Sequence, residues 1–177
     1  MKKLKTLKYR LAAILFLNLL FSLNVPAVKF YSINSLYGIS MRETYSVCKD
    51  DNGFVWASSK TGILRLSKDN YHIYRLPYES ADVFRVRLIY KNFKLFAYAN
   101  NGQVFYYNPV FDQFELILNL NRILLDMLID DNGICWIATS LGLYKYQSGK
   151  LSPAFEFSSN RYAINWYDSK NIIVRRF

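Results

Sequence analysis

The sequence predicts an all-β fold built from repeated four-stranded units. Residues 50–66 align without a gap with residues 130–146, and a weaker third copy lies halfway between them. Trp56, Phe96 and Trp136 occupy the same place in the three copies, 40 residues apart each time. A fixed period of this size, with short strands and no helical period, is typical of the blades of a β-propeller.

The first copy shows how each unit is expected to fold. Strands are predicted at residues 45–48, 54–58, 63–66 and 71–76, where β-branched and aromatic residues are frequent. The Asn52-Gly53 pair between the first two strands supplies the positive φ angles of a tight hairpin turn. Each repeat therefore has the four strands of one blade.

The same period divides the rest of the chain. Blades are expected at about residues 41–80, 81–120 and 121–160, with a partial copy at 161–177. Propellers close with about four to eight blades, so three and a half cannot form a ring. We expect the chain to be the front part of a longer protein or a truncated product, with completion by a partner chain as the alternative.

The N-terminus has the layout of a secretory signal, and residues 1–27 are predicted to be one. Five of the first ten residues are basic, an apolar run covers 11–25, and a small residue, Ala27, ends the segment. An uncleaved membrane anchor is the alternative, although the apolar run is shorter than the roughly 20 residues of a typical span. In either case residues 28–177 are predicted to be periplasmic.

The charge and the potential metal ligands exclude several functions. The net charge is +10, but the N-terminal segment holds a cluster of bases and the other bases are scattered, so nucleic-acid binding is not expected.

Cys48 and Cys135 occupy different positions in their repeats, which favours two small buried residues over a disulfide. With His72 as the only histidine, no metal or cofactor is expected. The Asp-rich turn at residues 50–53 lacks the spaced ligands of a calcium loop.

The repeated residues are assigned structural roles first. The aromatic residues of the shared position are expected between neighbouring blades, and the glycines are expected to close hairpins or to begin the next strand. The structural set is Gly53, Trp56, Gly62, Phe96, Gly102, Gly133, Trp136 and Gly142.

The pattern Asp-x-x-Gly-x-x-Trp-x-x-Thr-x-x-Gly-Leu, complete at residues 130–143, resembles the two-component regulator propeller repeat. That repeat builds the periplasmic sensor region of hybrid two-component regulators in Bacteroides-type bacteria. The second copy departs from it, with Phe93 in place of the hairpin Gly and Phe96 in place of the Trp. Ser58 and Ala138 stand where Gly is usual. The lead-in at residues 29–40 resembles the segment that opens these regions and usually contributes a ring-closing strand.

The resemblance implies a non-catalytic sensor that detects oligosaccharides. The kinase output modules of such regulators are not found in this chain, so no enzyme activity is expected. Aromatic rings can stack on sugars while polar neighbours bind the hydroxyl groups. The second-turn residues Lys60, Asn100 and Ser140 are predicted to share one rim and to bind the ligand.

Two other functions stay open. An exported scaffold for protein–protein interaction is one, because repeat arrays often serve that purpose. A glycan-active enzyme is the other, but a hydrolase needs two carboxylates about 5–10 Å apart, and the turn acids lie on separate repeats. The expected partners are an oligosaccharide and the remainder of the propeller or a partner chain. Membrane contact is expected only through an uncleaved signal segment or a missing C-terminal part.

Overall fold

The computed structural model describes residues 32–38, 41, 43–60, 62–68, 70–77, 85–156, 162–166 and 171–176. The chain divides into two compact units, Met1–Ile39 and Ser40–Phe177, which are considered separately. The predicted signal segment at residues 1–27 lies outside the described residues.

In the first unit, the described residues form one short helix, α2 (Ile33–Tyr37). Gly38 ends it in the left-handed conformation, with a φ of 64°. The expectation of a ring-closing strand was wrong for these residues. A strand needs a neighbouring strand to pair its backbone groups, whereas in α2 the Leu36 amide bonds locally to the Ser32 carbonyl.

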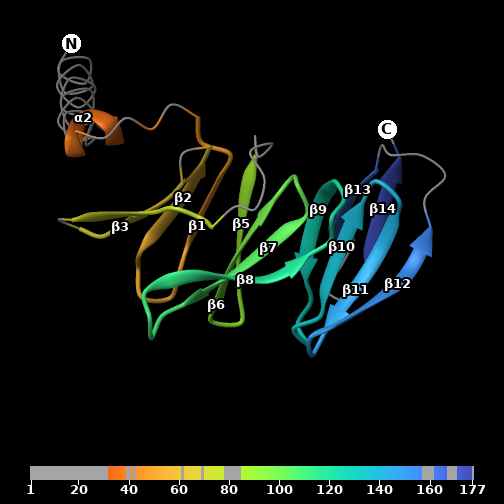
Figure 1. The fold of residues 1–177 in the computed structure, drawn as a ribbon. Helices are drawn as coiled ribbons and strands as arrows, with labels where there is room; N and C mark the ends of the chain where they lie inside the picture. The colour runs from red at the N-terminus through yellow and green to blue at the C-terminus, as the bar shows by residue number, and fades with distance from the viewer. Residues whose placement is uncertain are drawn as a thin grey trace, which may run out of the picture. The chain divides into compact units, whose positions relative to one another are not determined.

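The described residues of the second unit lie mostly in strands, and Figure 1 shows their sheets following one another along the chain. In this part of the chain, three sheets have four antiparallel strands each, and a fourth has two. Blade 1 contains β1 (Ser46–Lys49), β2 (Val55–Ser59), β3 (Gly62–Leu66) and β4 (Tyr71–Tyr74). Blade 2 contains β5 (Val86–Lys91), β6 (Lys94–Ala99), β7 (Gln103–Asn108) and β8 (Gln113–Asn119). Blade 3 contains β9 (Leu124–Ile129), β10 (Cys135–Thr139), β11 (Gly142–Gln147) and β12 (Lys150–Glu156). The fourth sheet pairs β13 (Tyr162–Trp166) with β14 (Ile172–Arg176).

Each full blade is a meander in which consecutive strands are neighbours. The first strands of successive blades, β1, β5, β9 and β13, contact one another in that order. Blades 2 and 3 also share an irregularity: the pairing of the third and fourth strands shifts between Val104 and Phe105, and again between Leu143 and Tyr144. The two shifts lie 39 residues apart, one short of the 40-residue period, so both blades have an irregularity near the start of the third strand, at positions that are not strictly equivalent.

The hydrophobic core lies between blades. One cluster joins blades 1 and 2 around Trp56 and Phe105, and a second joins blades 2 and 3 around Tyr98 and Ile137. A third, smaller cluster joins blade 3 to Ile164 of β13. Sheets that pack face to face in sequence order, each with four meandering strands, form an incomplete β-propeller. The predicted fold class is confirmed.

Candidate functional site

The first Asp of each strong repeat anchors the Trp of the same repeat. In blade 1 the indole Nε1 of Trp56 donates to Asp50 Oδ2 at 2.8 Å, while the Phe54 amide donates to Asp50 Oδ1 at 2.9 Å. In blade 3, Trp136 Nε1 donates to Asp130 Oδ2 at 3.2 Å. These carboxylates therefore close a hairpin and orient an aromatic ring, a role that the sequence did not reveal.

The hydroxyl and glycine of the motif shape the second hairpin. Thr139 Oγ1 donates to the Gly142 carbonyl and accepts from the Gly142 amide, at 3.1 and 3.2 Å. In blade 1, Ser59 Oγ donates to the Gly62 carbonyl at 3.1 Å. A Cβ atom added to Gly142 would lie 2.4 Å from the Phe155 carbonyl oxygen. Glycine is required there because the fourth strand approaches closely.

The three aromatic residues of the shared position pack toward the following sheet. Trp56 is 1% exposed and lies in the cluster between blades 1 and 2. Half-buried Phe96 packs against the cluster between blades 2 and 3, and half-buried Trp136 against the cluster that includes Ile164 of β13. One side chain per blade thus covers the same kind of interface.

Small side chains stand where neighbouring blades meet. Ser58 is fully buried, and its hydroxyl donates to the Val86 carbonyl of β5 at 2.7 Å. Ser46 Oγ accepts a 3.0 Å hydrogen bond from the Leu88 amide, also on β5. Hydroxyl groups of blade 1 therefore bond directly to the first strand of blade 2.

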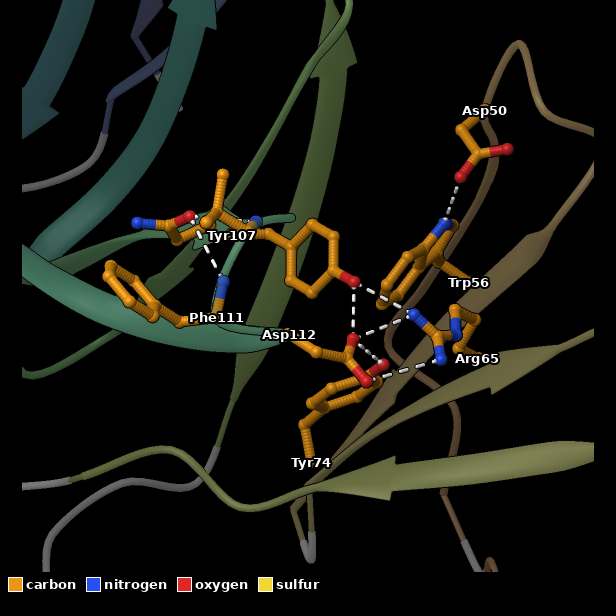
Figure 2. Close-up of polar contacts among 9 residues, drawn as sticks. Asp50, Trp56, Arg65, Tyr74, Tyr107, Phe111 and Asp112 are labelled. Carbon is orange, nitrogen blue, oxygen red and sulfur yellow. Dashed lines mark hydrogen bonds and ion pairs between the residues drawn. The ribbon is translucent and has the colours of Figure 1, made fainter.

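A polar network that does not repeat joins blades 1 and 2 beside Trp56 (Figure 2). Arg65 of β3 forms a 2.8 Å ion pair with Asp112, which lies in the turn between β7 and β8. Arg65 Nη1 also donates to the Tyr107 hydroxyl at 2.8 Å. Tyr74 and Tyr107 both donate to Asp112 Oδ1. Two tyrosines and one arginine thus share a single carboxylate across the interface.

The environment of this network shifts the pKa values of its members. The hydrogen bond from Tyr107 is the main cause that lowers the pKa of Asp112, and Tyr74 and Arg65 add to it. Burial is the main cause that raises the pKa of Tyr74, and its hydrogen bond to Asp112 adds to the effect. The network therefore holds an ionised aspartate beside neutral phenols at neutral pH.

Arg65 also borders a pocket in blade 1. The pocket has a volume of about 130 Å³ and is open to solvent. Its lining comprises two aromatic rings and four polar or charged side chains: Phe54, Arg65, Ser67, Asn70, Tyr71 and His72. The guanidinium lies over the rings of Phe54, Trp56 and Tyr74, with 5.2 to 5.5 Å between its carbon and the ring centroids. Such stacking holds the cation in one place at the edge of the pocket.

The predicted rim residues have unlike surroundings. Lys60 is exposed and Ser140 is half-buried, but Asn100 is only 7% exposed. Asn100 Oδ1 accepts a 2.9 Å hydrogen bond from the Arg85 amide, and its carbonyl accepts from the Leu124 amide. Asn100 thus supports a connection between strands. The pocket lies at the opposite end of β2 and β3 from Lys60, because Phe54 precedes β2, Ser67 follows β3, and Lys60 is in the turn that joins them.

Metal and disulfide chemistry find little support among the described residues. Cys48 and Cys135 are free thiols, and burial raises the pKa of each to about 11. Within the described ranges, no three His, Cys, Asp or Glu side chains gather as metal ligands would. Nor does any helix formed by those residues have the length and apolar character needed to cross a membrane.

No family model and no curated protein sequence matches the chain. Solved structures do match. An extracellular domain of a hybrid two-component system from B. thetaiotaomicron superposes with a TM-score of 0.66 at 19% identity, over 80% of this chain and 21% of that one. The extracellular domain of another such system from the same organism gives a TM-score of 0.61 at 13% identity, over 77% and 22%. Virginiamycin B lyase from Staphylococcus aureus gives a TM-score of 0.56 at 14% identity, over 76% and 55%.

The comparisons define a class of fold. The chain has the β-propeller architecture that is also found in extracellular domains of two-component systems, and it spans about a fifth of the length of those domains. The lyase shows that the same architecture also occurs in an enzyme. At these levels of identity the similarity concerns the fold, so function has to come from the site.

Proposed function

We propose that the chain is an exported, non-catalytic propeller segment of a two-component sensor, and that it binds an oligosaccharide. The observation that carries this proposal is the similarity to extracellular domains of two different two-component systems over about four fifths of the chain. Their greater length supports a role as one segment of a larger sensor region. The pattern at residues 130–143, which resembles the repeat of such sensors, supports it independently.

The geometry of the acids favours binding over catalysis. A glycoside hydrolase needs two carboxylates that face one bond. Here Asp50 and Asp130 each bind the Trp and the hairpin of their own blade. Asp112 is held by two tyrosines and Arg65. These carboxylates are committed to structural contacts, so none of them is placed to attack or protonate a glycosidic bond.

The blade 1 pocket is the better candidate for the ligand site. Tyr71 is 37% exposed and Phe54 lies beside it in the lining, so aromatic surface is available for stacking on a sugar ring. Polar groups of Ser67, Asn70 and His72 surround that surface. Aromatic surface with a few convergent polar groups is the usual composition of a small-molecule site. The rim at Lys60 and Ser140 remains the competing location.

Calorimetry with the full chain and a panel of oligosaccharides tests both the ligand class and the location. We expect Tyr71→Ala to weaken binding about tenfold or more, because it removes an aromatic anchor. Phe155→Ala is the matched control, since Phe155 is an exposed aromatic residue on the fourth strand of blade 3. Loss of binding in a Lys60→Ala/Ser140→Ala double variant, with Tyr71→Ala unaffected, would place the site at the rim instead. Failure of every oligosaccharide to bind would contradict the proposed ligand class.

A further inference from the structure

The blade 1 pocket offers hydrogen-bond donors and one fixed positive charge, and none of the described residues that line it carries a carboxylate. Arg65 supplies the charge, and Asn70 and His72 add nitrogen atoms. Sugar hydroxyl groups both donate and accept hydrogen bonds, so a site for neutral sugars uses acceptors as well as donors. A carboxylate only accepts hydrogen bonds and matches a set of donors.

Contacts within the β3–β4 turn already use the acceptor atoms of Asn70. Asn70 Oδ1 accepts a 2.7 Å hydrogen bond from the Tyr71 amide. The Asn70 carbonyl accepts from the Ser67 amide at 2.8 Å and from Ser67 Oγ at 3.1 Å. The side-chain group of Asn70 left to meet a ligand is its amide Nδ2, which donates. The Asn70 side chain therefore suits a ligand group that accepts hydrogen bonds.

Arg65 is positioned by other groups and retains donor capacity. Its Nη1 donates to Asp112 and Tyr107, and its Nη2 makes a longer contact of 3.5 Å with Asp112. A guanidinium has five N–H donors, and in the described part of the chain its Nε makes no hydrogen bond. The Arg65 side chain is 23% exposed, which leaves it accessible from the pocket. Charge-assisted bonds between arginine and a carboxylate are about twice as strong as bonds between neutral groups.

We propose that this pocket is a subsite for the carboxylate of an acidic sugar, a uronic acid within an oligosaccharide. Arg65 and the Asn70 amide bind the carboxylate, and Tyr71 contacts the sugar ring. A volume of about 130 Å³ suits one group of a ligand, since whole small-molecule sites occupy about 300–1,000 Å³. The inference rests on the proposed oligosaccharide-binding function and adds the chemical class of the sugar.

The ion pair between Arg65 and Asp112 makes this proposal sharply testable. Asp112 occupies two of the guanidinium nitrogens and partly balances their charge. A ligand carboxylate at Arg65 competes with Asp112 for the same cation. Removing the charge of Asp112 should therefore strengthen acidic ligands while leaving neutral ones unchanged.

The experiment is calorimetry of the full chain with trimers of galacturonic and glucuronic acid and with the matching galactose and glucose trimers. We expect at least one acidic trimer to bind about tenfold or more tighter than its neutral counterpart, and added salt to reduce the difference. Arg65→Gln should remove that preference. Because Arg65→Gln also breaks a contact between blades, Asp112→Asn is the second variant, and it should tighten acidic binding several-fold. Lys150→Gln, which removes one exposed positive charge in blade 3, is the control.

The outcomes separate this inference from the proposed function. Equal or tighter binding of neutral trimers would overturn the acidic subsite and leave oligosaccharide binding in place. Equal weakening of acidic and neutral trimers by Arg65→Gln and Asp112→Asn would show that Arg65 acts only through the fold, which also overturns it. If no trimer binds and the wider panel also fails, both proposals are wrong.

Discussion

The indole of Trp56 is held by the carboxylate of Asp50, six residues earlier in the chain, through a 2.8 Å hydrogen bond. Trp136 and Asp130 repeat the pair in blade 3. In each blade the other carboxylate oxygen accepts the amide four residues after the Asp. The six-residue spacing that blades 1 and 3 share joins a turn, a ring and the interface between blades in one unit.

The first prediction concerns this pair. Asp50→Ala should lower the free energy of unfolding by about 1–3 kcal/mol, because it leaves the N–H of the buried Trp56 without its hydrogen-bond partner. Chemical denaturation followed by tryptophan fluorescence measures the change. Asn52→Ala, an exposed substitution in the same turn, should cost much less. Equal effects of the two substitutions would show that the turn, and not the indole bond, is what matters.

The glycine at the start of the third strand should tolerate no side chain. Gly142→Ala places a Cβ atom 2.4 Å from the Phe155 carbonyl oxygen, which forces the outer strands of blade 3 apart. We expect a loss of about 1–3 kcal/mol or more. Gly149→Ala is the comparison, since Gly149 has a φ of 77° and open space around it, and its cost should be about 1–2 kcal/mol. Thermal unfolding of both variants would refute the close-approach explanation if Gly149→Ala were the more damaging.

A substitution in the β5–β6 turn should increase the stability of the chain. Phe93 has a φ of 61° and is 83% exposed, so its ring gains little burial while its backbone is in a conformation that suits glycine. Phe93→Gly restores the Asn-Gly turn and should stabilise the chain by up to about 1 kcal/mol. Val110→Gly, at an equally exposed turn position where no positive φ occurs, should not stabilise. A lower melting temperature for Phe93→Gly would contradict this view of the turn.

The Asp112 network predicts a dependence of stability on pH. The pKa of the Asp112 carboxyl is lowered in the folded chain, mainly by the hydrogen bond from Tyr107. The stabilisation is therefore complete above the unfolded pKa of about 3.9 and is lost as the pH falls through the lower folded value. Relative to Asp112→Asn, the natural chain should be more stable by up to about 1 kcal/mol near pH 7, since Asp112 is half exposed. This difference should shrink below about pH 4, and a difference that grew on acidification would contradict the assignment.

Thiol titration tests the state of the cysteines. Burial raises the pKa of Cys48 and Cys135 to about 11, so both should react slowly with a disulfide reagent at pH 8 while the chain is folded. After denaturation without reductant, both should react quickly. A denatured chain with no reactive thiol would instead indicate the disulfide alternative.

The repeat made the fold predictable because its residues act over short distances. Asp50 reaches Trp56 across six positions, and Thr139 reaches Gly142 across three. The same local geometry therefore recurs wherever the motif recurs. The all-β class, the hairpins and the position of the aromatic residues could be predicted from this pattern alone.

The weakened second repeat shows why equivalent positions in the repeats can have different surroundings. Blade 2 has Ala99 where the other blades have Ser59 and Thr139, so the hydroxyl that closes the turn is missing. Asn101 Oδ1 accepts the Gln103 amide at 3.2 Å in its place. Neighbouring Asn100 turns inward to bond the Arg85 amide. Asn100 is therefore buried, whereas its counterparts in the other two blades are exposed or half-buried.

The amino-acid sequence by itself determined a series of four-stranded blades with aromatic rings between them, since period, turn chemistry and strand propensity are local properties. Only the tertiary structure decided where chemistry can occur. Arg65 and Asp112 are 47 residues apart and have no counterpart in the other repeats, so no pattern links them. Their contact, and the pocket beside it, exist because packing two blades around Trp56 brings one strand and one distant turn together.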